Sequence, residues 1–321
     1  MRRNPKFRSN YTAFFVVLCL MAMDELIQQF QAGNIRALAR CISIVENESV
    51  GYETLMKQLK PQRNVPVVGF TGAPGAGKSS LVNALVHTLL KENKRVAIIA
   101  VDPTSPFNYG SLLGDRIRMA DHFNNDRVYI RSMATRGSLG GLCGKIVEVV
   151  MVMQSFGFDT ILIETVGVGQ SEVEIAGVAD TTVVVMVPEA GDEVQTLKSG
   201  VMEIADIFVV NKSDREGAEK MALNLQKLVH GKPQQTWNIP VINTIATQNT
   251  GLDALARAIE QHSAVAHNNL HKSQLMAEKA LLLIQQHYVK HLQKSEMEKE
   301  ILDLLNKHAF HLFDYVQSKI K

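Results

Sequence analysis

The stretch VVGFTGAPGAGKSS, residues 67–80, decides the fold of this chain. From residue 72 to residue 79 it matches the pattern G-x-x-x-x-G-K-[ST] at every fixed position. A run of apolar residues precedes the glycines, and apolar residues follow at helical spacing: Leu81, Val82, Leu85, Leu89 and Leu90. This context predicts a phosphate-binding loop between a buried strand and a helix, and it argues against an accidental glycine-rich turn.

Each residue type in this loop suits a phosphate ligand. Glycines let backbone N–H groups approach and wrap the phosphates, and the helix N-terminus adds a favourable dipole. Lys78 is expected to reach the β and γ phosphates, and Ser79 is expected to bind Mg²⁺. The predicted nucleotide-binding residues of the loop are Gly72, Ala73, Pro74, Gly75, Ala76, Gly77, Lys78, Ser79 and Ser80.

The composition is that of an ordinary globular protein. The 321 residues are enough for one large domain or a domain with appendages, and 46% of them are hydrophobic. The formal net charge of +2 gives no electrostatic reason to expect a nucleic-acid partner. Cys19, Cys41 and Cys143 form no CxxC pair, which favours a reducing cytoplasm over a disulfide framework or a zinc site.

The first residues resemble a signal peptide, because four basic residues within 2–8 precede an uncharged apolar stretch, residues 13–23. However, no A-x-A-like cleavage site follows, and the run is shorter than the roughly 20 residues that a bilayer span needs. We therefore expect residues 1–22 to be an upstream extension, with Met21 or Met23 as the natural start, and we expect no membrane partner. A weak membrane anchor is the alternative.

Two patterns follow along the chain. Residues 23–62 have apolar residues three and four apart, which predicts N-terminal helices, broken into two at Gly33 and Asn34. From residue 63 to residue 263, apolar runs alternate with helical segments. The runs predict strands at residues 67–70, 96–101, 128–130, 160–163, 182–187, 207–210 and 241–242.

These strands define the fold class. Their valine and isoleucine runs lack polar alternation, which indicates strands that are buried on both faces. We therefore predict an α/β fold with a doubly wound, mostly parallel sheet, of the P-loop nucleoside triphosphatase type. Ligands of such sheets bind beyond the carboxyl ends of the strands, so the loops there are expected to carry function.

Residues 264–321 have a helical pattern. Charged residues between 294 and 300 predict a solvated segment, and one apolar face is predicted for Ile301, Leu304, Leu305, Ala309, Leu312, Phe313 and Val316. This region either packs onto its own domain or forms an arm that pairs with a second subunit.

The stretch FVVNKSD, residues 208–214, indicates which nucleotide binds. The carboxylate of Asp214, if buried, can accept hydrogen bonds from the ring N–H and the exocyclic amine of guanine, a donor pair that adenine lacks. Asn211 and Lys212 are expected to brace the loop, with the Lys212 stem along the base. A backbone N–H that reaches the guanine oxygen is expected after the next strand, in Thr244, Ile245 and Ala246. GTP is therefore predicted, with ATP as the alternative.

Acidic residues at strand ends and in loops are the candidates for Mg²⁺ and for the attacking water. Glu164 is expected to hold Mg²⁺, directly or through water, and Asp115 to orient the water. Glu164 begins the sequence ETVG, where a Ras-like GTPase has D-x-x-G, and Gly167 is expected to offer its N–H to the γ phosphate. Asp102 is a third candidate. A turn residue and a solvated loop acid are the alternative interpretations of Asp102 and Asp115.

Seven ordered motifs resemble the MeaB/ArgK family of GTPases, which are associated with methylmalonyl-CoA mutase and were earlier named LAO/AO transport kinases. The motifs read GAPGAGKSSLVNAL, IAVDPTSP, GSLLGDRIRM, SMATRGSLGGL, ETVGVGQSE, EAGDEVQTLKSGVMEIADI and VVNKSD. The resemblance runs from about Asp24 through the nucleotide-binding domain.

The resemblance implies a P-loop GTPase domain of the SIMIBI class. It also implies a homodimer formed through the C-terminal arm and a chaperone that loads and protects adenosylcobalamin on the mutase. It implies that Lys78, Asp115 and Glu164 are catalytic. The implied metal and water shell is Ser79, Asp102, Asp115 and Glu164. The implied partner-sensing switch lies in residues 189–200, with Asp192, Glu193, Gln195 and Lys198.

Two other functions compete with this chaperone. The older family name suggests a kinase of a lysine–arginine–ornithine transport system, but the sequence indicates no second substrate site. A metallochaperone GTPase is expected to need a Cys and His cluster, whereas His87, His122 and Cys143 are interpreted as scattered.

Overall fold

The computed structural model describes residues 22–62, 64–102, 119–122, 124–134, 144–165, 171–190, 201–230, 237–265, 270–289, 292, 294–307 and 309–320. The chain forms two compact units, of which the first ends at Lys272 and the second begins at Ser273.

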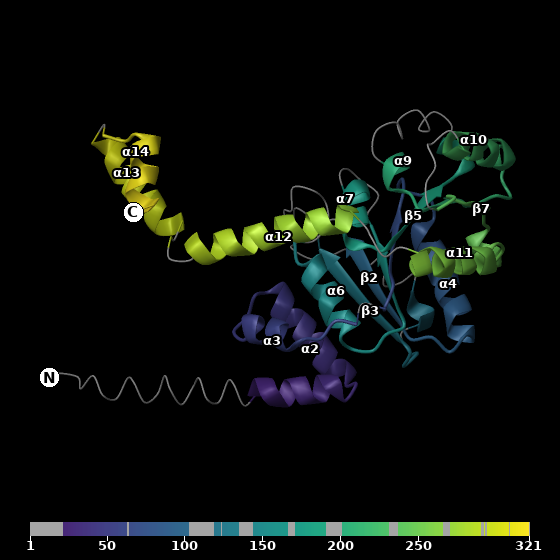
Figure 1. Cartoon of the computed structure of the whole chain (residues 1–321), viewed down its shortest axis with the longest axis horizontal. Helices are drawn as coiled ribbons and strands as arrows, with labels where there is room; N and C mark the ends of the chain where they lie inside the picture. Colours follow the sequence, from purple (N-terminus) through teal and green to yellow (C-terminus); the bar gives the residue numbers. More distant parts are fainter. Residues whose placement is uncertain are drawn as a thin grey trace. The chain divides into compact units, whose positions relative to one another are not determined.

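A seven-stranded sheet forms the centre of the first unit (Figure 1). The strands are β1 (Val67–Thr71), β2 (Val96–Asp102), β3 (Val128–Ala134), β4 (Thr160–Glu164), β5 (Thr181–Met186), β6 (Ile207–Val210) and β7 (Val241–Asn243). They lie in the order β3-β2-β4-β1-β5-β6-β7, and every pairing between these strands is parallel. The predicted α/β fold with a parallel sheet is confirmed, and the phosphate loop leaves its central strand.

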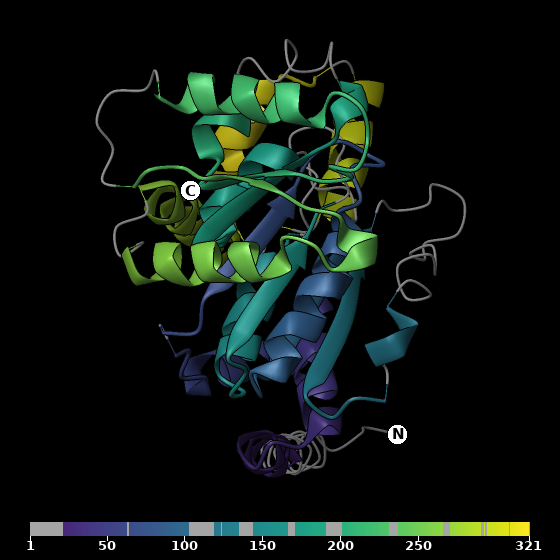
Figure 2. The ribbon, with the colours of Figure 1, turned by 90° about the vertical axis from the view of Figure 1, so that its right-hand side faces the viewer.

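Helices cover both faces of this sheet. Every residue of the inner strands β1, β4, β5 and β6 is therefore buried. One face is covered by α4 (Lys78–Lys91), α10 (Ala218–His230) and α11 (Leu252–Val265), and the other by α6 (Ile146–Gln154) and α7 (Ser171–Val178). Figure 2 shows α4 and α11 in front of the strands. Phe70, Leu85 and Phe208 are among the fully buried side chains of the core between the sheet and the helices α4, α10 and α11.

The edge strand β3 is longer than predicted. The apolar pattern indicates only residues 128–130, but pairing with β2 continues to Ala134. Most of β3 is half-buried, and Arg131 interrupts its apolar run. An edge strand needs no continuous apolar run because it lacks a second neighbouring strand. Here Arg131 forms an ion pair with Glu46 of α2 (Ile35–Glu46).

The N-terminal region forms three helices instead of the predicted two. Residues 22–31 are helical, and α2 and α3 (Tyr52–Gln58) follow. The break at Gly33 and Asn34 is confirmed, since Asn34 Oδ1 caps α2 by accepting a hydrogen bond from the Arg36 N–H at 2.8 Å. The apolar pattern does not indicate the second break, in which α2 ends at Glu46 and Gly51, with a left-handed backbone at φ of +92°, precedes α3.

The second unit contains most of α12 (Leu270–Val289), together with α13 (Lys294–Asn306) and α14 (Leu312–Ile320). The single apolar face predicted for residues 301–316 is wrong, because the chain turns between α13 and α14. Glu300, expected to be solvated, accepts a hydrogen bond from the Tyr315 hydroxyl at 2.7 Å and forms an ion pair with Lys319 at 2.6 Å.

None of the helices in the described part of the chain is both long and apolar enough to cross a membrane.

Candidate nucleotide-binding site

The loop between β1 and α4 has the backbone that a phosphate cradle requires. Gly72, Gly75 and Gly77 have positive φ angles of +136°, +79° and +84°. A Cβ atom at Gly72 would lie 2.1 Å from the Val185 carbonyl oxygen, and one at Gly77 would lie 2.4 Å from Asn211 Nδ2. Glycine is therefore required at Gly72 and Gly77 by conformation and by space.

Lys78 is the first residue of α4 and lies inside this loop. Its side chain is buried, and its ammonium group donates hydrogen bonds to the carbonyls of Gly72 at 2.7 Å and Ala73 at 3.1 Å. Phosphate oxygens can replace these carbonyls as acceptors with little movement of the side chain. Of the other loop residues, Ala76 is buried, whereas Pro74, Gly75 and Ser80 are exposed.

Two predicted metal ligands, which belong to different elements, are hydrogen-bonded to each other. The Ser79 hydroxyl donates a hydrogen bond to Glu164 Oε1 at 2.6 Å, and both side chains are buried. Glu164 ends β4, the strand next to β1, where it pairs in register with Phe70. A hydroxyl and a carboxylate are oxygen donors of the kind that Mg²⁺ prefers, so this pair fits the predicted ion.

The other predicted residues of the metal and water shell are less fully described. Asp102 is the last residue of β2, which pairs with β4, so its backbone lies at the same edge of the sheet as Glu164. Asp115 and Gly167 lie outside the described residues. The same holds for the predicted partner-sensing residues, Asp192, Glu193, Gln195 and Lys198.

Asn211 ties the phosphate loop to the loops predicted to hold the base. Its buried side chain donates to the Ala76 carbonyl at 3.0 Å. Its Oδ1 accepts hydrogen bonds from the Thr244 hydroxyl at 3.1 Å and from the Ala246 N–H at 3.3 Å. One carboxamide therefore sets the spacing of three loops, which is the bracing role expected of this residue.

Lys212 makes a second link, because its ammonium group donates to the Gly75 carbonyl at 2.9 Å. Its backbone is left-handed, with φ of +55°, and the next residues turn toward solvent. Asp214 is exposed, although the selectivity argument assumed a buried carboxylate. A guanine base would itself have to cover Asp214 for the carboxylate to be desolvated.

The stretch Thr244, Ile245 and Ala246 already uses its backbone donors. The Thr244 N–H donates to the Val210 carbonyl at 2.9 Å, and the Ile245 N–H to the Thr250 carbonyl at 3.1 Å. The Ala246 N–H makes the longest of the three bonds, to Asn211. Ala246 is therefore the residue whose N–H a guanine oxygen could share at the lowest cost.

An ion pair beside this loop has no signal in the sequence. Arg215, directly after Asp214, pairs with Glu189 in the short helix η2 (Pro188–Ala190). The hydrogen bond from Arg215 lowers the pKa of the Glu189 carboxyl. Both side chains are half exposed, so the pair is a weak link between the two loops.

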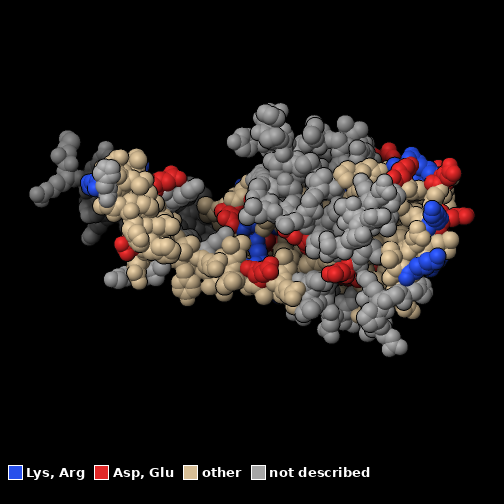
Figure 3. Space-filling model, turned by 90° about the horizontal axis from the view of Figure 1, so that it is seen from above, with Lys and Arg blue, Asp and Glu red and all other residues tan. Residues whose placement is uncertain are grey.

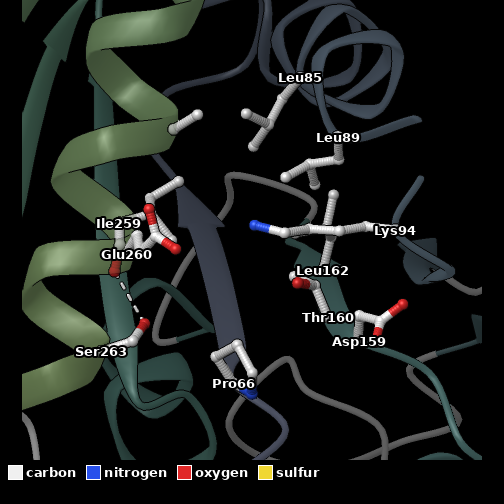
Figure 4. Close-up of a pocket in the computed structure, with 11 residues that line it drawn as sticks. Pro66, Leu85, Leu89, Lys94, Asp159, Thr160, Leu162, Ile259, Glu260 and Ser263 are labelled. Atoms are coloured by element: carbon white, nitrogen blue, oxygen red, sulfur yellow. Dashed lines mark hydrogen bonds between the residues drawn. The ribbon is translucent and has the colours of Figure 1, made fainter. Parts of the chain in front are cut away.

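A separate cavity of about 210 Å³ lies between α4, β4 and α11 (Figure 4). Leu85, Leu89, Leu162 and Ile259 form its apolar wall, and Lys94 points into it. None of the predicted nucleotide or metal residues lines this cavity. Because Leu85 and Leu89 belong to the later turns of α4, the cavity is distinct from the phosphate loop at the start of that helix.

Comparison with known proteins agrees with this geometry. The family model described as "Methylmalonyl Co-A mutase-associated GTPase MeaB" matches residues 38–300. A protein of Pyrococcus horikoshii named as a GTPase is 47% identical over 250 residues, which are 76% of this chain and 78% of that protein. A protein of Geobacillus kaustophilus named "Fused isobutyryl-CoA mutase" is 39% identical over 240 residues, 70% of this chain and 22% of that protein.

A solved structure shares the fold. The crystal structure titled "LAO/AO transport system kinase" superposes with a TM-score of 0.64 at 23% identity, over 93% of this chain and 96% of that one.

Proposed function

The chain belongs to the MeaB family of methylmalonyl-CoA mutase-associated GTPases, and we propose that it is an Mg²⁺-dependent GTPase and a chaperone of such a mutase. In this proposal, GTP binding and hydrolysis assist the loading and protection of adenosylcobalamin on the mutase. One observation carries the proposal. The phosphate loop is hydrogen-bonded through Asn211 to the loop that carries Asp214, which supports one connected site for the phosphates and the proposed guanine base.

The described residues support a division of labour in hydrolysis. Mg²⁺ bound with GTP would offset the negative charge of the β and γ phosphates. Ser79 and Glu164 would supply oxygen ligands, Glu164 directly or through water. Lys78 is already held inside the loop, so its charge meets the phosphates without further ordering. Asp115 is proposed to orient the attacking water, and Gly167 to contact the γ phosphate.

The family description and the fused mutase relative support the choice of partner. The segment that matches this chain belongs to a protein that is itself named as a CoA mutase. By analogy, we propose that this chain contacts its mutase partner through residues 189–200, with Lys198 as the sensing residue. A cytoplasmic location follows, because the proposed cycle needs a supply of GTP.

The test measures phosphate release from GTP by the purified full chain, with and without the mutase encoded with it. Intrinsic turnover is expected to be slow, and the mutase is expected to raise it, by up to the ~10⁵-fold known for GTPase-activating partners. Lys78→Ala should abolish turnover in both conditions. Lys198→Ala should keep the intrinsic rate and lose most of the stimulation.

Each negative result of this experiment would overturn a different part of the proposal. Absence of GTP turnover in both conditions would overturn the GTPase assignment, and absence of stimulation would overturn the mutase partner. A parallel assay with a binding protein of a transport system added would favour the kinase alternative if the γ phosphate were transferred to that protein instead of to water. Full stimulation of Lys198→Ala would overturn only the sensing role.

We also propose that the second unit forms a homodimer. Leu281, Ile284 and Tyr288 of α12 are three and four residues apart and are exposed by 56%, 53% and 73%. The described part of this unit shows broad uncharged areas in Figure 3. An apolar helix face of this kind needs a covering partner, and a second copy of the chain offers the same face in return.

A further inference from the structure

A pair of histidines lies beside the phosphate-loop helix, away from the nucleotide residues. His87 belongs to α4, and His122 is the last residue of the short helix η1 (Ala120–His122). By sequence position these two histidines are scattered, but the fold brings their rings together, while Cys143 lies outside the described residues. Their ring centroids lie 4.5 Å apart.

His122 is the buried member of the pair. Its side chain is 2% exposed, and its Nε2 has no hydrogen-bond partner among the described residues. Asn83, one turn before His87 on α4, has a buried side-chain oxygen that also has no partner there. Native proteins rarely leave such atoms unpaired, so each of them indicates a partner beyond the described residues, and a bound metal ion is such a partner for the ring nitrogen of His122.

The surroundings of His122 lower its pKa. Burial is the main reason that the pKa of His122 lies below its usual value, and the neighbouring His87 lowers it further. A backbone hydrogen bond at Asn83 and the charge of Asp121 act in the opposite direction with smaller effect.

We propose that His87 and His122 bind a divalent transition metal ion of the Zn²⁺, Co²⁺ or Ni²⁺ type. These ions favour imidazole nitrogen, whereas Mg²⁺ favours oxygen. Two imidazoles on one Zn²⁺, with bonds of about 2.0–2.1 Å, have ring centres roughly 5 Å apart. The observed separation of 4.5 Å is close to that value.

Two imidazoles leave further positions on the ion, and within the described residues these are open to water. No group of three or more His, Cys, Asp or Glu side chains that could hold a metal occurs in the described part of the chain. The side-chain oxygen of Asn83 can accept a hydrogen bond from a metal-bound water. Because α4 begins with Lys78 and Ser79, the ion would fasten η1 to the helix that carries the phosphate loop.

The experiment uses the full chain saturated with GDP and Mg²⁺, so that the oxygen site at Ser79 and Glu164 is occupied. Co²⁺ and Zn²⁺ are titrated separately, and binding is followed by equilibrium dialysis. Wild type is expected to bind one equivalent saturably. His87→Ala, at an exposed position, should weaken binding by at least the about 10- to 100-fold that loss of an outer-shell partner costs. His311→Ala is the control, because this histidine is 65% exposed in the second unit and should not matter.

A second variant tests coordination directly. His87→Cys should keep Co²⁺ binding and gain a thiolate-to-cobalt charge-transfer band that wild type lacks. Three results would overturn the proposal: no saturable binding by wild type, which would mean that water alone fills the site; equal affinity in His87→Ala; or Co²⁺ bound to His87→Cys without the band. None of these results depends on GTPase activity, so the proposed function stands or falls separately.

Discussion

Asp214 is the residue on which guanine selectivity is expected to depend. Asp214→Asn replaces an acceptor pair with an acceptor and a donor, so GTP should lose a charge-assisted hydrogen bond. The 2-oxo group of xanthosine triphosphate should instead accept a hydrogen bond from the new amide. A loss of about 1.5–3 kcal/mol in GTP binding is expected, which is roughly 10- to 150-fold. Competition of GTP, XTP and ATP against a fluorescent GDP measures it. If ATP competes as well as GTP in the wild type, the selectivity argument fails.

Asn211 is expected to matter for folding as well as for binding. Asn211→Ala removes three hydrogen bonds and leaves the buried Thr244 hydroxyl without one acceptor. The free energy of unfolding should fall by about 1–3 kcal/mol. Lys212→Ala breaks one exposed bond to the same loop and should cost less than about 1 kcal/mol. Urea unfolding of both variants measures the difference, and equal losses would contradict the bracing role.

Local chemistry explains which site residues a sequence can indicate. Gly72, Gly77 and Asn211 are set by backbone angles and by contact with one another, so their residue types recur as short patterns. The ion pair of Arg215 with Glu189 joins positions that are far apart in the chain. The unpaired ring nitrogen of His122 likewise lies in surroundings that distant segments of the chain build. No periodicity or spacing marks such pairs, and only the folded sheet brings them together.

At the scale of elements, α2 contains a buried thiol that should make stability depend on alkaline pH. Burial raises the pKa of Cys41 from 9.0 to about 11. Because the folded pKa of this acid is raised, ionisation favours the unfolded chain, and stability is lost as the pH rises above about 9. Between pH 9 and 11 the loss should approach about 2–3 kcal/mol. Cys41→Ala should remove this part of the slope in urea unfolding at several pH values, and an unchanged slope would contradict it.

Some helices and strands can be predicted from the apolar pattern of the sequence, and others cannot. The inner strands and the parallel sheet are predictable because burial on both faces demands continuous apolar runs. The full length of β3 is not, since an edge strand tolerates Arg131. The turn between α2 and α3 is not, since no gap in the apolar spacing marks the end of α2 at Glu46 or the left-handed Gly51 before α3.

At the scale of the whole molecule, the first unit contains the described nucleotide loops, and the second offers an apolar surface with no such loop. This separation predicts that association and GTP turnover respond to different substitutions. The proposed dimer face is Leu281, Ile284 and Tyr288 on α12. Placing two lysines on it would bury charge at a symmetric contact, which is costly without partners.

The double variant Leu281→Lys/Ile284→Lys is therefore expected to convert a dimer into a monomer while intrinsic GTP turnover stays near the wild-type rate. Leu223→Lys/Leu228→Lys is the matched control, because these leucines are also exposed, by 55% and 48%, but lie on α10 of the first unit. Light scattering after gel filtration gives the mass of each protein. A wild-type monomer, or a dimer that survives the α12 variant, would contradict the proposed face. A control that also becomes monomeric would place the contact on the first unit.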